Sequence, residues 1–176
     1  MKNGHALHVY FGQSKGKTTC AMGLAIRAAG QGKKVLVSQL MKTNTSGELN
    51  SLRQLDNITV VLGEPITKLT NMMTEQEMAE EKLRQRANFE KICCEIRELK
   101  PDMIVLDELC VAEHLDFVDT DRVLECIEEW LETSEVVLTG HWASEVIRDR
   151  ADYVTEMVKR KHPYDDGVQA RRGVEF

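Results

Sequence analysis

Short runs of apolar residues recur along the chain, and each run stops at a glycine, a polar residue or an acid. Polar residues do not alternate with apolar ones inside these runs, which is typical of strands buried on both faces of a parallel sheet. The predicted strands are 6–11, 35–40, 58–61, 103–106 and 135–139, with 152–157 as a weaker last strand.

Helical spacing of apolar residues separates the predicted strands. One helix follows the first strand and stops at Gly30, where glycine is a common helix end. A long helix starts at the capping box formed by Thr74 and Glu77 and ends before Pro101. The other predicted helices are 121–132 and a short helix capped by Ser144.

Alternating strands and helices predict an α/β fold, with a mostly parallel sheet flanked by helices on both faces. The chain has 176 residues, enough to bury one full core but not two, so we expect residues 1–176 to form a single domain. In such sheets ligands bind beyond the carboxyl ends of the strands, which is where we look for a site.

Composition narrows the function classes. The net charge of −6 disfavours nonspecific binding to nucleic acid. No apolar run is long enough to span a membrane and the first residues lack a signal peptide's apolar segment, so we expect a cytoplasmic protein. Five cysteines without a C-x-x-C pair predict reduced, mostly core thiols rather than disulfides or structural zinc.

The segment FGQSKGKTT at 11–19 has the character of a phosphate-binding loop. Gly16, Lys17 and Thr18 stand between a strand and a helix, where backbone N–H groups, a lysine cation and a hydroxyl that reaches Mg²⁺ would face phosphates. The spacing is a variant, because Phe11 occupies the first glycine position and Gly12 comes one residue late. The flanking strand and helix disfavour the alternative, a helix cap that binds nothing.

A second element is the apolar run MIVL followed directly by Asp107 and Glu108. P-loop proteins present the carboxylate on the Mg²⁺ side in this way. Alone, an acid at a strand end is more often a solvated loop residue or a helix cap, but the phosphate loop favours a metal role here.

No side chain stands out as a nucleophile. No serine lies in a nucleophile elbow, and the histidines are scattered without metal-ligand spacing. A protein that binds a triphosphate in this way can take its nucleophile from the second substrate. The histidines are His5, His8, His114, His141 and His162.

Taken together, these residues resemble the ATP:corrinoid adenosyltransferases of the P-loop type, which act on cob(I)alamin or cob(I)yrinic acid a,c-diamide. The matching segments run in order from Val9 to Phe176, and the tail motif KHPYDDGVQARRGVEF is the most specific, because it belongs to no general nucleotide motif. The other matching segments are FGQSKGKTTCAMGLAIRAAGQGKKVLVSQLMK, TSGEL, IVLDELCVA and VVLTGHWASEVIRDRADYVTEM. The resemblance implies a P-loop NTPase-like (RecA-like) domain.

The function implied by the resemblance is transfer of the 5′-deoxyadenosyl group of ATP to Co(I) of a corrinoid, with release of triphosphate, in adenosylcobalamin synthesis or salvage. Co(I) would attack the ribose C5′, and the loop would stabilise charge on the leaving triphosphate. The resemblance also implies a homodimer and a flavoprotein as a candidate reductant.

The resemblance assigns roles to residues of this chain. Lys15 and Lys17 would be the catalytic cations, and Mg²⁺ would be held by Thr18 with Asp107 or Glu108. The implied ATP contacts are Gly12, Gln13, Ser14, Lys15, Gly16, Lys17, Thr18, Thr19 and, in the tail, Tyr164, Asp165 and Arg171.

Two departures from the family pattern stand out. The family loop commonly reads TGNGKGKTT, and here Phe11 and Ser14 replace a threonine and a glycine. Family members also carry aromatic residues between the third strand and the long helix, thought to pack against the corrin ring, whereas here that segment reads GEPITKLTNMMTEQ. Met72 and Met73 could supply adaptable apolar contacts, or pack in the core.

Two other functions stay open at this point. A P-loop phosphotransferase or NTPase would release ADP, and the chain shows neither an arginine-rich lid nor a water-positioning residue. A nucleotide-gated corrinoid carrier or regulator would explain the missing aromatic residues, while Lys17, Thr18, Asp107 and the tail argue against it.

Overall fold

The computed structural model describes residues 1–175, so Phe176, the last residue of the tail motif, lies outside the described part. The strands form one sheet in the order β3-β2-β4-β5-β1-β6, and every neighbouring pair is parallel. This confirms the predicted α/β class. The strands are β1 Leu7–Phe11, β2 Val35–Gln39, β3 Ile58–Leu62, β4 Met103–Asp107, β5 Glu135–Gly140 and β6 Tyr153–Glu156.

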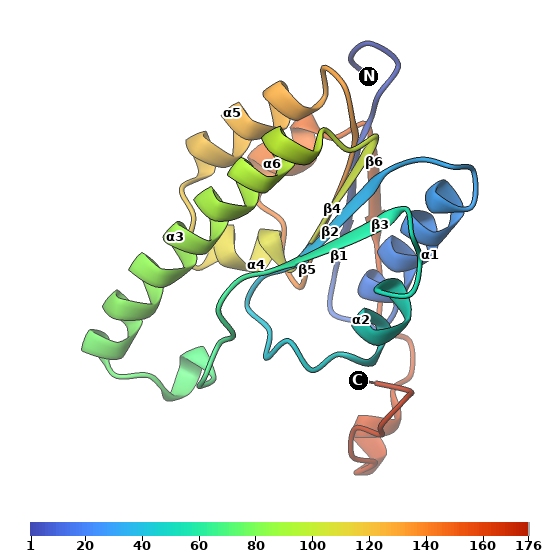
Figure 1. The fold of residues 1–176 in the computed structure, drawn as a ribbon. Coiled ribbons are helices and arrows are strands. Elements are labelled where there is room, and N and C mark those ends of the chain that lie inside the picture. Colours follow the sequence, from blue (N-terminus) through green and yellow to red (C-terminus); the bar gives the residue numbers. More distant parts are fainter. Residues whose placement is uncertain (176) are drawn as a thin grey trace.

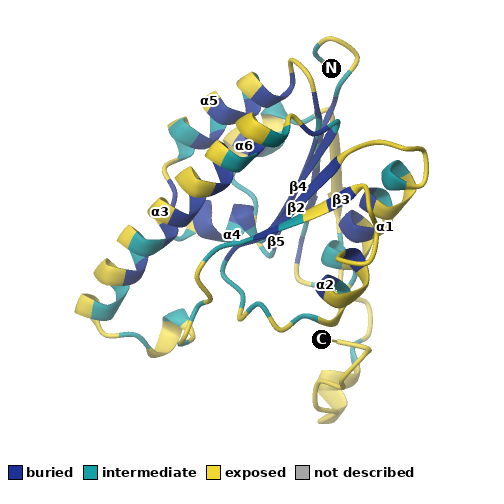
Figure 2. Cartoon of the chain, viewed as in Figure 1, coloured by how far each residue is buried: buried dark blue, intermediate teal, exposed yellow. Residues whose placement is uncertain are grey.

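Helices cover both faces of the sheet (Figure 1). One face packs against α1 (Lys17–Ala29) and α2 (Gly47–Leu52). The other packs against α3 (Glu75–Leu99), α4 (Leu109–His114), α5 (Thr120–Trp130) and α6 (Glu145–Arg150). Figure 2 shows the central strands buried between the two layers, which is why their sequences are apolar without alternation.

The long helix α3 starts as its sequence predicts. The Thr74 side chain accepts a hydrogen bond from the backbone of Glu77, and the Glu77 carboxylate accepts one from the backbone N–H of Thr74. The Lys68 ammonium, bonded to the same carboxylate, helps lower the pKa of Glu77 to about 2. Ser144 likewise caps α6 by accepting a hydrogen bond from the N–H of Ile147.

The sequence pattern did not predict α2 or α4. Each has six residues, which is less than two turns, so neither shows a clear helical period. Glu108, at φ 63°, turns the chain from β4 straight into α4. Both short helices start next to the carboxyl ends of strands, so they belong to the edge where ligands of such sheets bind.

The cysteines are free, and three of the five are buried, as predicted. Cys93 and Cys94 are adjacent on α3 and point to different sides, because Cys93 is buried and Cys94 is exposed. The Cys93 thiol lies 3.6 Å from that of Cys126 on α5. Among residues 1–175, no helix has both the length and the apolar composition needed to cross a bilayer.

Candidate functional site

The loop after β1 is shaped by a close crossing with the chain that follows β6. Gly12 has φ 114°, and a Cβ there would lie 2.6 Å from the carbonyl oxygen of Met157, so no other residue fits. The N–H of Ser14 donates to the same oxygen at 3.1 Å. This crossing gives a physical reason why the glycine stands one position later than in the common loop pattern.

The Lys17 ammonium lies over this loop. Its Nζ donates to the carbonyl oxygens of Gly12 and Ser14, both at 2.8 Å. Burial lowers the pKa of Lys17, while the nearby carboxylates of Glu108 and Asp107 oppose that shift. Gly16, at φ 120°, precedes α1 and supplies no side-chain cap, so the first N–H groups of α1 have no side-chain partner from the Ncap residue.

Asp107 is the centre of the polar network. Its side chain is fully buried at the end of β4 and accepts hydrogen bonds from four side chains that come from three other segments. These donors are Thr18 at 3.0 Å, Gln39 at 3.0 Å, Lys42 at 2.5 Å and Thr139 at 2.6 Å. Carboxyl ends of adjacent parallel strands meet at one edge, so β2, β4 and β5 bring these groups together.

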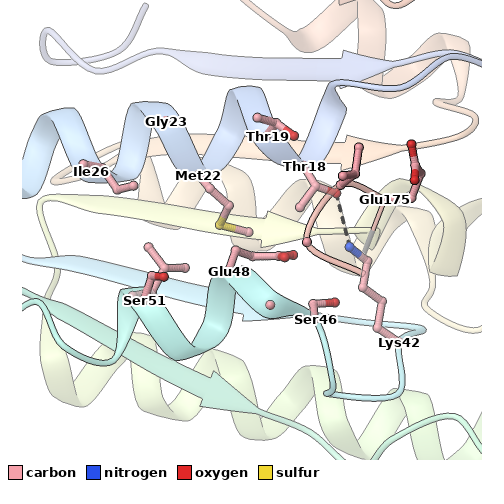
Figure 3. Close-up of a pocket in the computed structure, with 14 residues that line it drawn as sticks. Thr18, Thr19, Met22, Gly23, Ile26, Lys42, Ser46, Glu48, Ser51 and Glu175 are labelled. Carbon is pink, nitrogen blue, oxygen red and sulfur yellow. Dashed lines mark hydrogen bonds between the residues drawn. The ribbon is translucent and has the colours of Figure 1, made fainter. Parts of the chain in front are cut away.

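The Lys42 ammonium contacts both the hydroxyl of Thr18 and the carboxylate of Asp107, which are hydrogen-bonded to each other. The Lys42 Nζ is 3.2 Å from the Thr18 hydroxyl (Figure 3). It is 2.5 Å from the Asp107 carboxylate. Hard oxygen donors of this kind suit Mg²⁺. Glu108, the alternative carboxylate, is half-buried beside Asp107, and this partial burial, followed by the charge of Asp107, raises its pKa. The donor set therefore fits a divalent cation held by Thr18 and Asp107.

A cavity of about 550 Å³ opens beside these groups, between α1, α2 and the tail. Figure 3 shows Thr18 and Thr19 at one end, Met22 and Ile26 further along α1, and Glu48 on α2. This volume is within the usual size range of small-molecule sites. Phosphates held at the loop would therefore have adjoining space for the rest of a nucleotide.

The tail returns to the loop through charged contacts. The Lys15 Nζ donates to the carbonyl oxygen of Val174 at 2.6 Å and lies 3.2 Å from the Glu175 carboxylate. Arg171 pairs with Glu175 at 2.9 Å. The hydrogen bonds from Arg171, and to a smaller degree the one from Lys15, lower the pKa of Glu175 to about 2. Lys15 and Arg171 thus share one carboxylate at the rim of the cavity.

Three of the expected ATP contacts lie apart from this network. Tyr164 is 68% exposed and Asp165 pairs with Lys159, both in the turn 163–166 that projects from the body of the protein in Figure 1. Gln13 is exposed at the tip of the loop. The structure therefore gathers the other loop residues, Thr19, Asp107, Glu108 and Arg171 at one edge, but it does not bring the side chains of Gln13, Tyr164 and Asp165 to them.

Sequence reasoning did not single out Gln39, Lys42, Glu48 or Thr139. Gln39 links Asp107 to Glu48, which lies on α2. A signal was present for Gln39 and Thr139, because each is a polar residue near the carboxyl end of an apolar strand. Lys42 gives no such signal, since its role depends on the path of the loop between β2 and α2.

Met72 and Met73, for which both corrin contact and core packing were open, are not part of the hydrophobic core. Met72 is 63% exposed, and Met73 borders a cavity lined mainly by charged side chains at the start of α3. The core-packing alternative is therefore wrong for Met72. Leu69, in the same segment, is also exposed.

Comparison with known proteins gives a consistent result. Residues 3–176 match the family model described as ATP:corrinoid adenosyltransferase BtuR/CobO/CobP. Corrinoid adenosyltransferases of Escherichia coli K12 and Pseudomonas aeruginosa are 32% and 33% identical, covering 96% and 97% of this chain and 84% and 83% of their own. The corrinoid adenosyltransferase CobA of Salmonella typhimurium is 32% identical over 96% of this chain and 84% of its own.

Among solved structures, a KaiC-like protein from Pyrococcus horikoshii aligns with 98% of this chain and 68% of its own, with 14% identity and a TM-score of 0.45. That likeness is too slight to bear on function. The family match and the curated relatives together span nearly the whole chain, including the loop, the strand ending at Asp107 and the tail. This chain belongs to the family of ATP:corrinoid adenosyltransferases, BtuR/CobO/CobP.

Proposed function

We propose that this protein transfers the 5′-deoxyadenosyl group of ATP to the Co(I) centre of a corrinoid and releases triphosphate. The observation that carries the proposal is the joint presence of a family match over residues 3–176 and a phosphate loop whose Thr18 hydroxyl meets the buried Asp107 carboxylate. The first identifies the two substrates, and the second supplies a place for the triphosphate of one of them.

In this reaction the protein needs only to position the two substrates and to stabilise the charge of the leaving group. An electron pair of Co(I) forms the Co–C bond at the ribose C5′, the C5′–O bond breaks, and its electron pair leaves with triphosphate, so cobalt is oxidised to Co(III). No proton needs to move at the reacting carbon. Lys17 and Lys15 would stabilise the negative charge that grows on the leaving triphosphate.

A divalent cation is part of the proposal. Thr18 and Asp107 would hold Mg²⁺, which supplies neutralisation of phosphate charge when it is bound. The Lys42 ammonium contacts both groups, so it would compete with the metal for the same oxygens. We also propose ATP contacts from the loop residues 12–19 and, through Glu175, an indirect contribution of Arg171.

The organisation of the protein in the cell is proposed on the family resemblance. It would be a single domain over residues 1–176, a homodimer and a cytoplasmic enzyme, with a flavoprotein as candidate reductant. Sedimentation equilibrium of the purified chain tests the dimer, and a monomer at micromolar concentration would contradict it.

The decisive experiment is an anaerobic assay with ATP, Mg²⁺ and chemically reduced cob(I)alamin, in which the corrinoid spectrum is followed and the phosphate product is identified. We expect light-sensitive adenosylcobalamin and triphosphate in equal amounts. ATP and corrinoid binding without a Co–C bond would indicate a carrier, and release of ADP would indicate a phosphotransferase or NTPase. Either result would refute the proposal.

A further inference from the structure

Three aromatic rings gather at the carboxyl edge of the sheet, and neither the phosphate site nor the core uses them. The Trp142 ring stacks on that of His114, with centroids 4.7 Å apart and planes at 22°. His141 meets Trp142 edge-on at 4.4 Å. We call these three residues the aromatic shelf. Trp142 is 43% exposed, whereas Trp130 is buried, so the shelf presents a large apolar ring to solvent.

The shelf is fixed in place from two sides. The carbonyl oxygen of His141 accepts a hydrogen bond from the N–H of Gly12 at 3.2 Å, which joins the shelf to the phosphate loop. A Cβ on Gly140 would lie 2.7 Å from the Cβ of Cys110, so only glycine lets the end of β5 pass this close to α4. The turn that carries Trp142 is therefore held rigidly against α4.

The shelf also lies next to the phosphate loop, because the hydrogen bond from Gly12 reaches the residue before Trp142. The helix α4 starts directly after Glu108 and ends at His114, and its six residues span about 9 Å. Burial first, and then the positive charge of Lys17, lower the pKa of His141. A ligand lying on the shelf would thus lie beside the loop that is proposed to hold the triphosphate.

We propose that the aromatic shelf of His114, His141 and Trp142 binds the flat face or edge of the corrinoid macrocycle. This inference rests on the proposed function and names the residues that receive its second substrate. A corrinoid combines a wide conjugated ring with a polar amide periphery, and exposed tryptophan is the side chain best suited to contact such a ring. The segment 63–76, between β3 and α3, has no aromatic side chain to offer.

The test uses Trp142→Ala and Trp142→Phe, with Tyr153→Ala as a matched control. Tyr153 is 51% exposed and stacks on His8 at 4.4 Å, so it is also a solvent-facing aromatic ring on a histidine. It is the first residue of β6 and pairs with His8, near the amino ends of the strands, whereas the phosphate loop follows the carboxyl end of β1. Calorimetric titration with cob(II)alamin gives corrinoid affinity, titration with ATP gives nucleotide affinity, and thermal unfolding reports the fold.

We expect Trp142→Ala to weaken cob(II)alamin binding by about tenfold, and to raise the KM for cob(I)alamin similarly, without changing ATP affinity. Trp142→Phe should recover most of the loss, and Tyr153→Ala should behave as wild type. Unchanged corrinoid affinity in Trp142→Ala, or an equal loss of ATP affinity, would overturn the inference.

The two proposals fail in different ways. If wild type and Trp142→Ala form adenosylcobalamin equally well and bind cob(II)alamin equally tightly, the transferase proposal stands and the shelf proposal is overturned. If Trp142→Ala weakens cob(II)alamin binding but wild type forms no Co–C bond, the shelf stands as a corrinoid site and the transferase proposal is refuted.

Discussion

The Thr139 hydroxyl supports both acidic residues of the site, so replacing it with valine should destabilise the protein measurably. It donates to the Asp107 carboxylate at 2.6 Å and accepts from the N–H of Glu108 at 2.9 Å, and Thr139 is fully buried. Valine matches its shape but makes neither bond. A hydrogen bond to a charged group contributes about 1.5–3 kcal/mol and an unpaired buried N–H costs about 1–3 kcal/mol, so we expect a loss of about 3 kcal/mol.

Urea denaturation of Thr139→Val at neutral pH measures this loss, provided that the slope m stays unchanged. Ser38→Ala is the matched control, because Ser38 is a fully buried strand hydroxyl that has no hydrogen-bond partner among residues 1–175. Because its hydroxyl is buried without a partner among these residues, Ser38→Ala should leave the free energy of unfolding unchanged or raise it. Thr139→Ser, which keeps the hydroxyl, should recover most of the loss. The reasoning fails if Thr139→Val loses under about 1 kcal/mol or no more than Ser38→Ala.

Three further predictions concern charge in the site. Lys17→Ala should lower turnover by about 100-fold or more while the melting temperature stays within a few degrees, because the ammonium acts on phosphate charge rather than on the core; full activity would remove the loop from the mechanism. Arg171→Ala should raise the KM for ATP by about two- to fivefold, since Glu175 then holds Lys15 more strongly, and an unchanged KM would reduce this pair to solvated charge. In an NMR titration the pKa of His141 should lie below its usual value of 6.5. In Lys17→Ala this pKa should be higher than in wild type, because the lysine charge no longer lowers it, but still below 6.5, because burial remains. Since its pKa is lowered by folding, the stability linked to His141 is fully present above pH 6.5 and is lost as the pH falls through and below that value; a loss on raising the pH would contradict this sign.

The strands and the long helix were predictable because their causes are local. Unbroken apolar runs produce strands buried on both faces, and the Thr74–Glu77 capping box fixes the start of α3 within a few residues of sequence. The placement of Gly16, Lys17 and Asp107 was predictable for a related reason, since Asp107 ends β4 and the other two stand where the loop after β1 enters α1.

The rest of the site depends on contacts between distant segments. Lys42 reaches Asp107 from 65 residues away, and Lys15 meets Glu175 from 160 residues away. The stacking of Trp142 on His114 likewise joins the turn after β5 to the end of α4, which no local pattern connects. A single sequence shows which of these residues are charged or aromatic, but their pairing is decided by how the chain returns to the carboxyl edge of the sheet.

The positive charges that would meet a nucleotide are already paired in the protein as it stands. Lys15 is bound to the tail, Lys17 to two carbonyl oxygens and Lys42 to Asp107. On binding MgATP, these lysines would therefore exchange their protein partners for phosphate oxygens, whereas unpaired lysines would have no partner to lose. The free energy of binding then becomes a difference between two paired states, and ATP affinity should fall less steeply with ionic strength than three free lysines would predict.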